Sequence, residues 1–200
     1  DMIPRLADVT EGTVFVDGMD VREYKITDLR DKIGIVPQKA VLFAGTVRSN
    51  LAWGKEDATE EEMQQALSVA QAAEVVDKKD GKLDAEVEQG GKNFSGGQKQ
   101  RLTIARALVK QPEILIMDDS SSALDYATDA KLRQAIHNMP NRPTVFIVSQ
   151  RAASIMYADK IIVLDDGTVA GTGTHEELLK DCSVYQEIYY SQFKRTEGGH

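Results

Sequence analysis

Residues 93–101 read NFSGGQKQR and predict the start of a helix. Ser95 is a good N-cap, and apolar residues recur after it at helical spacing, at Leu102, Ala105, Leu108 and Val109. Gly96 and Gly97 leave the first turn without Cβ atoms, so a phosphate could approach its exposed N–H groups closely. A Ser-Gly-Gly tripeptide alone is more often a plain turn and cap, and the segment that follows favours the phosphate-binding interpretation.

That segment, residues 114–117, is a continuous apolar run that ends in two adjacent carboxylates, Asp118 and Asp119. A run without alternation is typical of a strand buried on both faces of a parallel sheet. Ligands of open α/β sheets bind at the carboxyl ends of the strands. The sequence therefore predicts a Mg²⁺–phosphate site at these two aspartates.

The rest of the chain also alternates between strand and helix patterns. Buried strands are predicted at 33–38 and 143–149, a short strand with an Asp-Gly turn at 11–18, and two strands around an Asp-Gly turn at 160–169. Residues 1–6 are predicted to be the end of a helix that the chain begins inside. Further helices are predicted over 129–138 and after the capping boxes Thr59/Glu62 and Thr174/Glu177. Residues 84–92 are polar and predict a loop. Trp53 is predicted to be a packing residue of the helical region.

The composition narrows the class of protein. Of 200 residues, 42% are hydrophobic and 28% charged, which suits one well-buried core with room for an inserted lobe. The formal net charge of −8 argues against a nucleic-acid partner, because phosphate backbones require an excess of Lys and Arg. Cys182 is the single cysteine, which excludes an internal disulfide and fits a reducing compartment. No apolar run approaches the ~18 residues of a membrane span, so any membrane association is expected to come through a partner or a further segment.

Three motifs in order carry a resemblance to a known family. Phe94-Ser95-Gly96-Gly97-Gln98, then residues 114–119, then Ser122-Ala123-Leu124-Asp125 resemble the signature, Walker B and D-loop motifs of an ABC transporter ATPase domain. The match runs from Ile3 to about Phe193. It implies an α/β fold of the P-loop NTPase (RecA-like) type, with a parallel-sheet core at 1–41 and 110–200 and an inserted α-helical subdomain at 42–109. No Gly-x-x-x-x-Gly-Lys-Ser/Thr occurs in the chain, which is therefore expected to begin just after a P-loop and to lack the N-terminal strands.

The resemblance also implies a role for each matching residue, with ATP and Mg²⁺ as cofactors. Asp118 would hold the metal, Asp119 would be the catalytic base, and Gln38 would be the Q-loop residue that also reaches Mg²⁺. Ser95, Gly96, Gly97 and Gln98 would contact nucleotide in trans, in a second ABC ATPase domain paired head to tail. The D-loop would be Ser122, Ala123, Leu124 and Asp125.

Two positions depart from the family pattern at the same site. Asp119 stands where a glutamate base is usual, one methylene shorter, and a misplacement of ~1 Å can cost about 100-fold in rate. Gln150 stands where a switch histidine is usual, and an amide cannot carry the charge of an imidazolium. The resemblance therefore implies a degenerate hydrolytic site, as in one subunit of a heterodimeric multidrug or lipid exporter, whose intact signature completes the partner's site.

Residues 42–51 resemble the segment after the Q-loop in exporters, and residues 85–88 resemble the X-loop, although a plain surface loop is an equal alternative. These similarities imply a transmembrane-domain partner and a location at the cytoplasmic face of the plasma membrane. Two other hypotheses stay open. One is a soluble ABC ATPase without a membrane partner, and the other is a non-catalytic module whose signature helix only docks a partner.

Overall fold

The computed structural model describes residues 1–120 and 122–197. The chain divides into two compact units, Asp1–Val148 and Ser149–His200. No helix in the described ranges is both long enough and apolar enough to cross a membrane.

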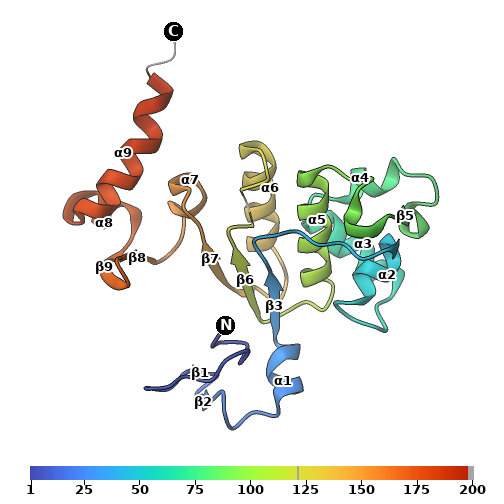
Figure 1. The fold of residues 1–200 in the computed structure, drawn as a ribbon, viewed down its shortest axis with the longest axis horizontal. Helices are drawn as coiled ribbons and strands as arrows, with labels where there is room; N and C mark the ends of the chain where they lie inside the picture. The colour runs from blue at the N-terminus through green and yellow to red at the C-terminus, as the bar shows by residue number, and fades with distance from the viewer. Residues whose placement is uncertain (121, 198–200) are drawn as a thin grey trace. The chain divides into compact units, whose positions relative to one another are not determined.

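A parallel sheet forms the centre of the first unit (Figure 1). It consists of β3 (Ile33–Val36), β6 (Ile114–Asp118) and β7 (Thr144–Val148), in the order β3-β6-β7. Ile33 pairs with Ile114, and Asp118 pairs with Val148 at the carboxyl end. Parallel neighbours need long crossovers, and α6 (Tyr126–His137) lies in the connection from β6 to β7.

The strands are less buried than the sequence predicted. In β6, Leu115 and Met117 are buried, whereas Ile114 and Ile116 are only partly buried. The prediction of a buried strand at 143–149 is wrong for this chain, because the side chains of β7 are largely exposed and Val148 is 57% exposed. Within the described residues β7 pairs with β6 alone, so it is an edge strand.

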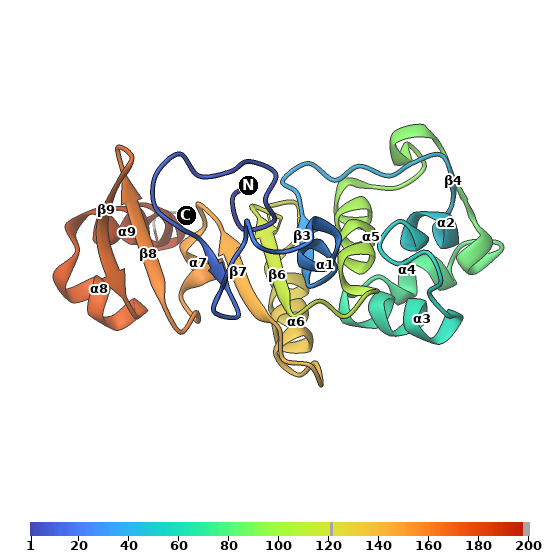
Figure 2. The ribbon, with the colours of Figure 1, turned by 90° about the horizontal axis from the view of Figure 1, so that it is seen from below.

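The long connection from β3 to β6 holds a group of helices, which lie together beyond β3 in Figure 2. These helices are α2 (Val47–Ala52), α3 (Glu60–Val69), α4 (Ala73–Asp77) and α5 (Gly96–Leu108). Their buried side chains belong to the largest core cluster, which also includes Leu115 and Met117 of β6 and Leu132 and Ile136 of α6. The predicted capping box at Thr59 and Glu62 is present at the start of α3.

The segment predicted as a loop at 84–92 contains regular structure. The short helix η1 (Lys82–Asp84) leads into β5 (Glu86–Val87), and η2 (Gln89–Gly91) follows. β5 pairs antiparallel with β4 (Gly45–Thr46), a partner that lies about forty residues away and that local sequence patterns do not reveal.

The N-terminal part of the first unit forms a small layer of its own. β1 (Phe15–Val16) and β2 (Met19–Asp20) form a hairpin whose turn residues Asp17 and Gly18 both have positive φ, as a primed turn requires. The helix α1 (Ile26–Asp31) buries Leu29 against this hairpin. Residues 1–6 form hydrogen-bonded turns and not the predicted helix end, since the Leu6 N–H donates to the Asp1 carbonyl at 2.9 Å.

The second unit has its own core. The predicted pair of strands is present as β8 (Ile161–Asp165) and β9 (Thr168–Gly173), joined by the Asp-Gly turn. The predicted capping box at Thr174 opens α8 (His175–Asp181), which is followed by α9 (Ser183–Glu197), and α7 (Ala152–Ile155) precedes the hairpin. The core residues are Ile161, Val163, Leu178, Cys182 and Tyr185.

Candidate functional site

The two carboxylates at the end of β6 have different surroundings. Asp118 is exposed, whereas Asp119 is half-buried and has a φ of 41°, in the left-handed region that non-glycine residues rarely adopt. The Asp119 N–H donates to the Val148 carbonyl at 2.7 Å, which holds this turn against the end of β7. A strained residue at the carboxyl end of a parallel strand is typical of a functional position.

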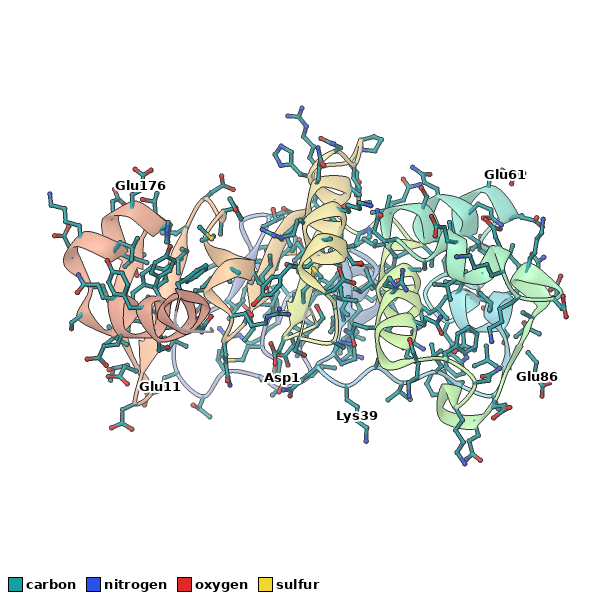
Figure 3. The ribbon with its side chains drawn as sticks, turned by 90° about the horizontal axis from the view of Figure 1, so that it is seen from above. Asp1, Glu11, Lys39, Glu61, Glu86 and Glu176 are labelled. Carbon is teal, nitrogen blue, oxygen red and sulfur yellow. The ribbon has the colours of Figure 1, made fainter. Side chains whose placement is uncertain are left out.

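The end of β3 brings an amide to the same place. Gln38 is exposed, and its Nε2 lies 3.5 Å from Oδ2 of Asp119. Its neighbour Lys39 points away from the ribbon in Figure 3. The structure thus brings together Gln38 and Asp119, which are 81 positions apart in the sequence.

These oxygen ligands fit Mg²⁺ with a phosphate. Carboxylate and amide oxygens are hard ligands, and protein sites usually give Mg²⁺ one or two carboxylates while waters and substrate phosphates complete the octahedron. Within the described ranges no cluster of three or more His, Cys, Asp or Glu residues could hold a metal by itself. Asp118 and Gln38 would hold the ion, and the remaining ligands would come from a nucleotide.

The start of α5 is built as the sequence predicted. Ser95 Oγ accepts a hydrogen bond from the Gln98 N–H at 3.3 Å, and Gln98 Oε1 accepts one from the Ser95 N–H at 3.0 Å. A Cβ on Gly96 would have no neighbour within 4 Å, and one on Gly97 would meet only the Ala123 carbonyl at 3.2 Å. Packing in this chain therefore does not require Gly96, which leaves an open helix start of the kind that binds anions.

The predicted D-loop residues connect the two parts of the site. Ser122 donates from Oγ to the Asp119 carbonyl at 2.8 Å, and Leu124 is 5% exposed in the main core. Asp125 is the N-cap of α6 and accepts hydrogen bonds from the N–H and hydroxyl of Thr128, which lower the pKa of its carboxyl group below the ordinary value. Ala123 is exposed beside Gly97.

Gln150 belongs to the second unit, whereas Asp119 belongs to the first. Its side chain is exposed, and its carbonyl accepts a hydrogen bond from Gln192 Nε2 of α9 at 2.6 Å. Gln192 Oε1 also accepts from the Ala152 N–H at 2.9 Å. The turn that carries Gln150 is therefore fixed by the C-terminal helix.

A feature that the sequence prediction missed lies between β3 and the helices. Trp53 does not pack inside the helical region, because it is 71% exposed and contacts the ring of Phe43 at a centroid distance of 5.0 Å. The prediction failed because Trp53 follows α2 and lies off the buried face of that helix, which is formed by Val47, Asn50 and Leu51. The spacing of these buried residues in the sequence was the signal that could have shown Trp53 to be exposed.

Phe43 and Trp53 line a cavity of about 350 Å³ together with Arg30, Arg106 and Lys110, and the lining contains no acidic residue. The Arg106 guanidinium donates from Nη2 to the Val41 carbonyl at 3.0 Å and lies 5.3 Å from the Phe43 ring centroid. Its Nη1 is buried and has no hydrogen-bond partner within the described part of the chain. Burial lowers the pKa of both Arg106 and Lys110. The cavity is therefore apolar, aromatic and cationic.

The family model described as ABC transporter matches residues 1–122, more than half of the chain. The chain belongs to the ABC transporter family. An uncharacterized ABC transporter ATP-binding protein of Mycobacterium tuberculosis is 49% identical over 99% of the chain. An ATP-dependent lipid A-core flippase of Desulfotalea psychrophila is 38% identical over 96% of the chain. The chain spans about a third of the length of these relatives, 34% in both cases.

The solved structure of a bacterial Atm1-family ABC exporter with ATP bound matches with a TM-score of 0.90 and 36% identity. The match covers 95% of this chain and 34% of that chain. The predictions of an α/β fold with a parallel-sheet core and of a nucleotide-binding domain of the ABC exporter type are therefore confirmed. The roles assigned to single residues and the division into subdomains stay predictions.

Proposed function

We propose that this chain is the ATP-binding part of an ABC exporter, and that it couples the binding and hydrolysis of Mg-ATP to transport through a transmembrane domain. The observation that carries the proposal is the start of α5, where a capped helix with open space over Gly96 begins within the family motif. Ser95, Gly96, Gly97 and Gln98 would contact the phosphates of a nucleotide held mainly by a second ATPase domain.

The chain's own carboxylates would serve a second nucleotide. Asp118 and Gln38 would hold Mg²⁺, Asp119 would orient the attacking water, and Gln150 would donate a hydrogen bond to the terminal phosphate. Ser122, Ala123, Leu124 and Asp125 would form the D-loop between the two sites. In this proposal residues 1–41 and 110–200 form the core, and residues 42–109 form the helical subdomain.

This second site would hydrolyse ATP slowly. The side chain of Asp119 is one methylene shorter than that of a glutamate, so its carboxylate reaches less far from the backbone. The side chain of Gln150 is a neutral amide at every pH. The partner would then be a different chain with its own intact carboxylate and histidine, so the assembly would be a heterodimer. Two relatives named as export ATP-binding/permease proteins support the presence of a transmembrane domain in the whole protein.

The cavity around Phe43 and Trp53 would be the docking surface for that transmembrane domain. An exposed tryptophan beside a cavity of about 350 Å³ is unusual for a surface that remains in water. The three cations of the lining and the unpartnered Arg106 Nη1 favour a docking segment that carries an apolar side chain and a carboxylate. The segment would be a cytoplasmic end of the transmembrane domain.

The proposed function is tested in the assembled full-length transporter. We expect Ser95→Arg to abolish most of the ATPase activity, because a long cation at the N-cap removes the hydroxyl and fills the open helix start. Conservative Ser95→Thr keeps the capping oxygen and is the control. The measurement is phosphate release with the purified pair. Full activity in Ser95→Arg would contradict a nucleotide contact at this motif and favour a non-catalytic module.

The degenerate site is tested by restoring the residues usual in the family. We expect Asp119→Glu combined with Gln150→His to raise ATP turnover at this site, because the carboxylate regains its reach and the imidazole can carry charge. Turnover is measured in pairs whose other site has been inactivated. Each single substitution is the control and is expected to give a smaller gain. An unchanged rate in the double variant would show that these two residues do not limit hydrolysis.

A further inference from the structure

Asn93 lies directly before the signature and makes contacts that its position in the sequence does not suggest. Its Nδ2 donates to the Glu86 carbonyl at 2.8 Å, and its Oδ1 accepts from the Glu88 N–H at 3.1 Å. One carboxamide thus bonds to two alternate backbone groups of the strand segment 86–88, as the next strand of a sheet would. The Glu86 side chain itself is exposed and points away from the helices (Figure 3).

Lys79 holds the same residue from a second direction. Its Nζ donates to the Asn93 carbonyl at 3.0 Å and lies 4.5 Å from the ring centroid of Phe94, which is buried. The Phe94 N–H donates to the Gly91 carbonyl at 3.0 Å. Asn93 and Phe94 are therefore fixed, and Ser95, the N-cap of α5, follows them without an intervening residue.

On its other side, segment 86–88 is bonded to residues that lead to the cavity. Thr46 pairs with Glu86, and the Val47 N–H donates to the Ala85 carbonyl at 3.1 Å. Buried Asn50 donates to the Thr46 carbonyl at 3.0 Å and to the Phe43 carbonyl at 2.8 Å, and it accepts from the Phe43 N–H at 2.9 Å. A continuous path of hydrogen bonds and chain therefore runs from Phe43, at the cavity, to Ser95.

We infer that Asn93 is a positioning residue that transmits displacement of the strand segment 86–88 to the N-terminus of α5, and so links occupation of the Phe43–Trp53 cavity to the placement of Ser95. The inference rests on two parts of the proposed function: that Ser95 contacts a nucleotide, and that the cavity is the docking surface for a partner. Asparagine is required because the amide must donate to one backbone group and accept from another, which aspartate and alanine cannot do together.

The link is tested first by amide hydrogen exchange on the chain of residues 1–200. In Asn93→Ala we expect the Glu88 amide to exchange about tenfold faster and the Ser95 and Gln98 amides several-fold faster. Asn93→Asp keeps the acceptor and should disturb Glu88 less, so it remains informative if Asn93→Ala folds poorly. The matched control is Asn141→Ala. Asn141 also bonds two backbone carbonyls, those of Gln111 and Pro112, and its loss should leave Ser95 and Gln98 unchanged.

Exchange that rises at Glu88 but not at Ser95 and Gln98 would overturn the inference. In the assembled transporter, Asn93→Ala is expected to raise the KM for ATP several-fold with little change in kcat, because a displaced signature closes on nucleotide less readily. A several-fold fall of kcat with an unchanged KM would indicate general destabilisation and contradict a positioning role. If wild-type transporter shows no ATPase activity, the proposed function fails, while the exchange experiment still decides whether Asn93 links the two segments.

Discussion

Gly54 and Gly96 are two glycines that the chain uses for different purposes. A Cβ on Gly54 would clash with the carbonyl oxygen of Arg106, a backbone atom that cannot move aside. A Cβ on Gly96 would lie in open space. Gly54 is needed because the segment that follows α2 approaches the backbone of α5 closely. Gly96 instead leaves room for a ligand from outside this chain.

We therefore expect Gly54→Ala to lower the free energy of unfolding by about 1–3 kcal/mol, through overpacking. Gly96→Ala is the matched control, and it should leave stability unchanged or raise it by about 0.5–1 kcal/mol, because alanine is the better helix former. Urea unfolding followed by circular dichroism measures both. A loss of stability in Gly96→Ala as large as that in Gly54→Ala would show that Gly96 also serves packing.

At position 119 the sequence predicted the side chain's role but not the backbone conformation. The carboxylate and its place after a buried strand were predicted from the sequence, whereas the left-handed φ of 41° was not, because aspartate is compatible with ordinary strand geometry. In that geometry the Asp119 N–H donates to the Val148 carbonyl, and this bond depends on a strand that follows later in the chain.

Capping makes the helices the most predictable elements. The capping boxes predicted at Thr59 and Thr174 are present, and the predicted N-cap Ser95 forms a capping box as well. Each of these motifs spans only four residues of sequence. The pairing of β4 with β5 was not predicted, since two residues in each strand carry too little pattern and their register depends on the packing of α2 and η1.

The cap of α6 gives the chain a pH-dependent element. Hydrogen bonds from Thr128 lower the pKa of Asp125 in the folded state below its ordinary value of 3.8. A lowered folded pKa means that the stabilisation is complete above about pH 4 and is lost as the pH falls through the folded pKa.

We therefore compare the wild type with Asp125→Asn, which keeps a capping oxygen without the charge. The wild type should be the more stable above about pH 4, and the difference should shrink as the pH falls below the ordinary pKa of 3.8 and through the lowered folded pKa. Urea unfolding at a series of pH values measures the difference. A difference that does not shrink as the carboxylate becomes protonated would contradict stabilisation by the Asp125 carboxylate.

At the scale of the whole molecule, we expect Trp53 to contribute little to the stability of the chain and much to its assembly with a transmembrane domain. Trp53→Ala should change the stability of the chain by less than about 0.5 kcal/mol, because the side chain is 71% exposed. In the full-length transporter the same change should reduce transport several-fold, because the proposed docking surface would lose its largest apolar side chain.

Leu164→Ala is the control for this experiment, since Leu164 is a similarly exposed apolar residue, at 67%, and is not among those lining the cavity. Transport into inverted vesicles provides the measurement. Normal transport by Trp53→Ala would place the docking surface elsewhere.

The sequence alone was sufficient for the family, the α/β fold and the start of α5, because motifs, capping boxes and apolar runs are local and each carries its own physical reason. Three features depended on long-range packing. Gln38 meets Asp119 only because β3 lies beside β6, and Asn93 meets Glu86 only because β5 is held by β4. Trp53 is exposed because the buried face of α2 turns away from it. Contacts between distant segments depend on strand order and helix packing, which no local pattern in the chain specifies.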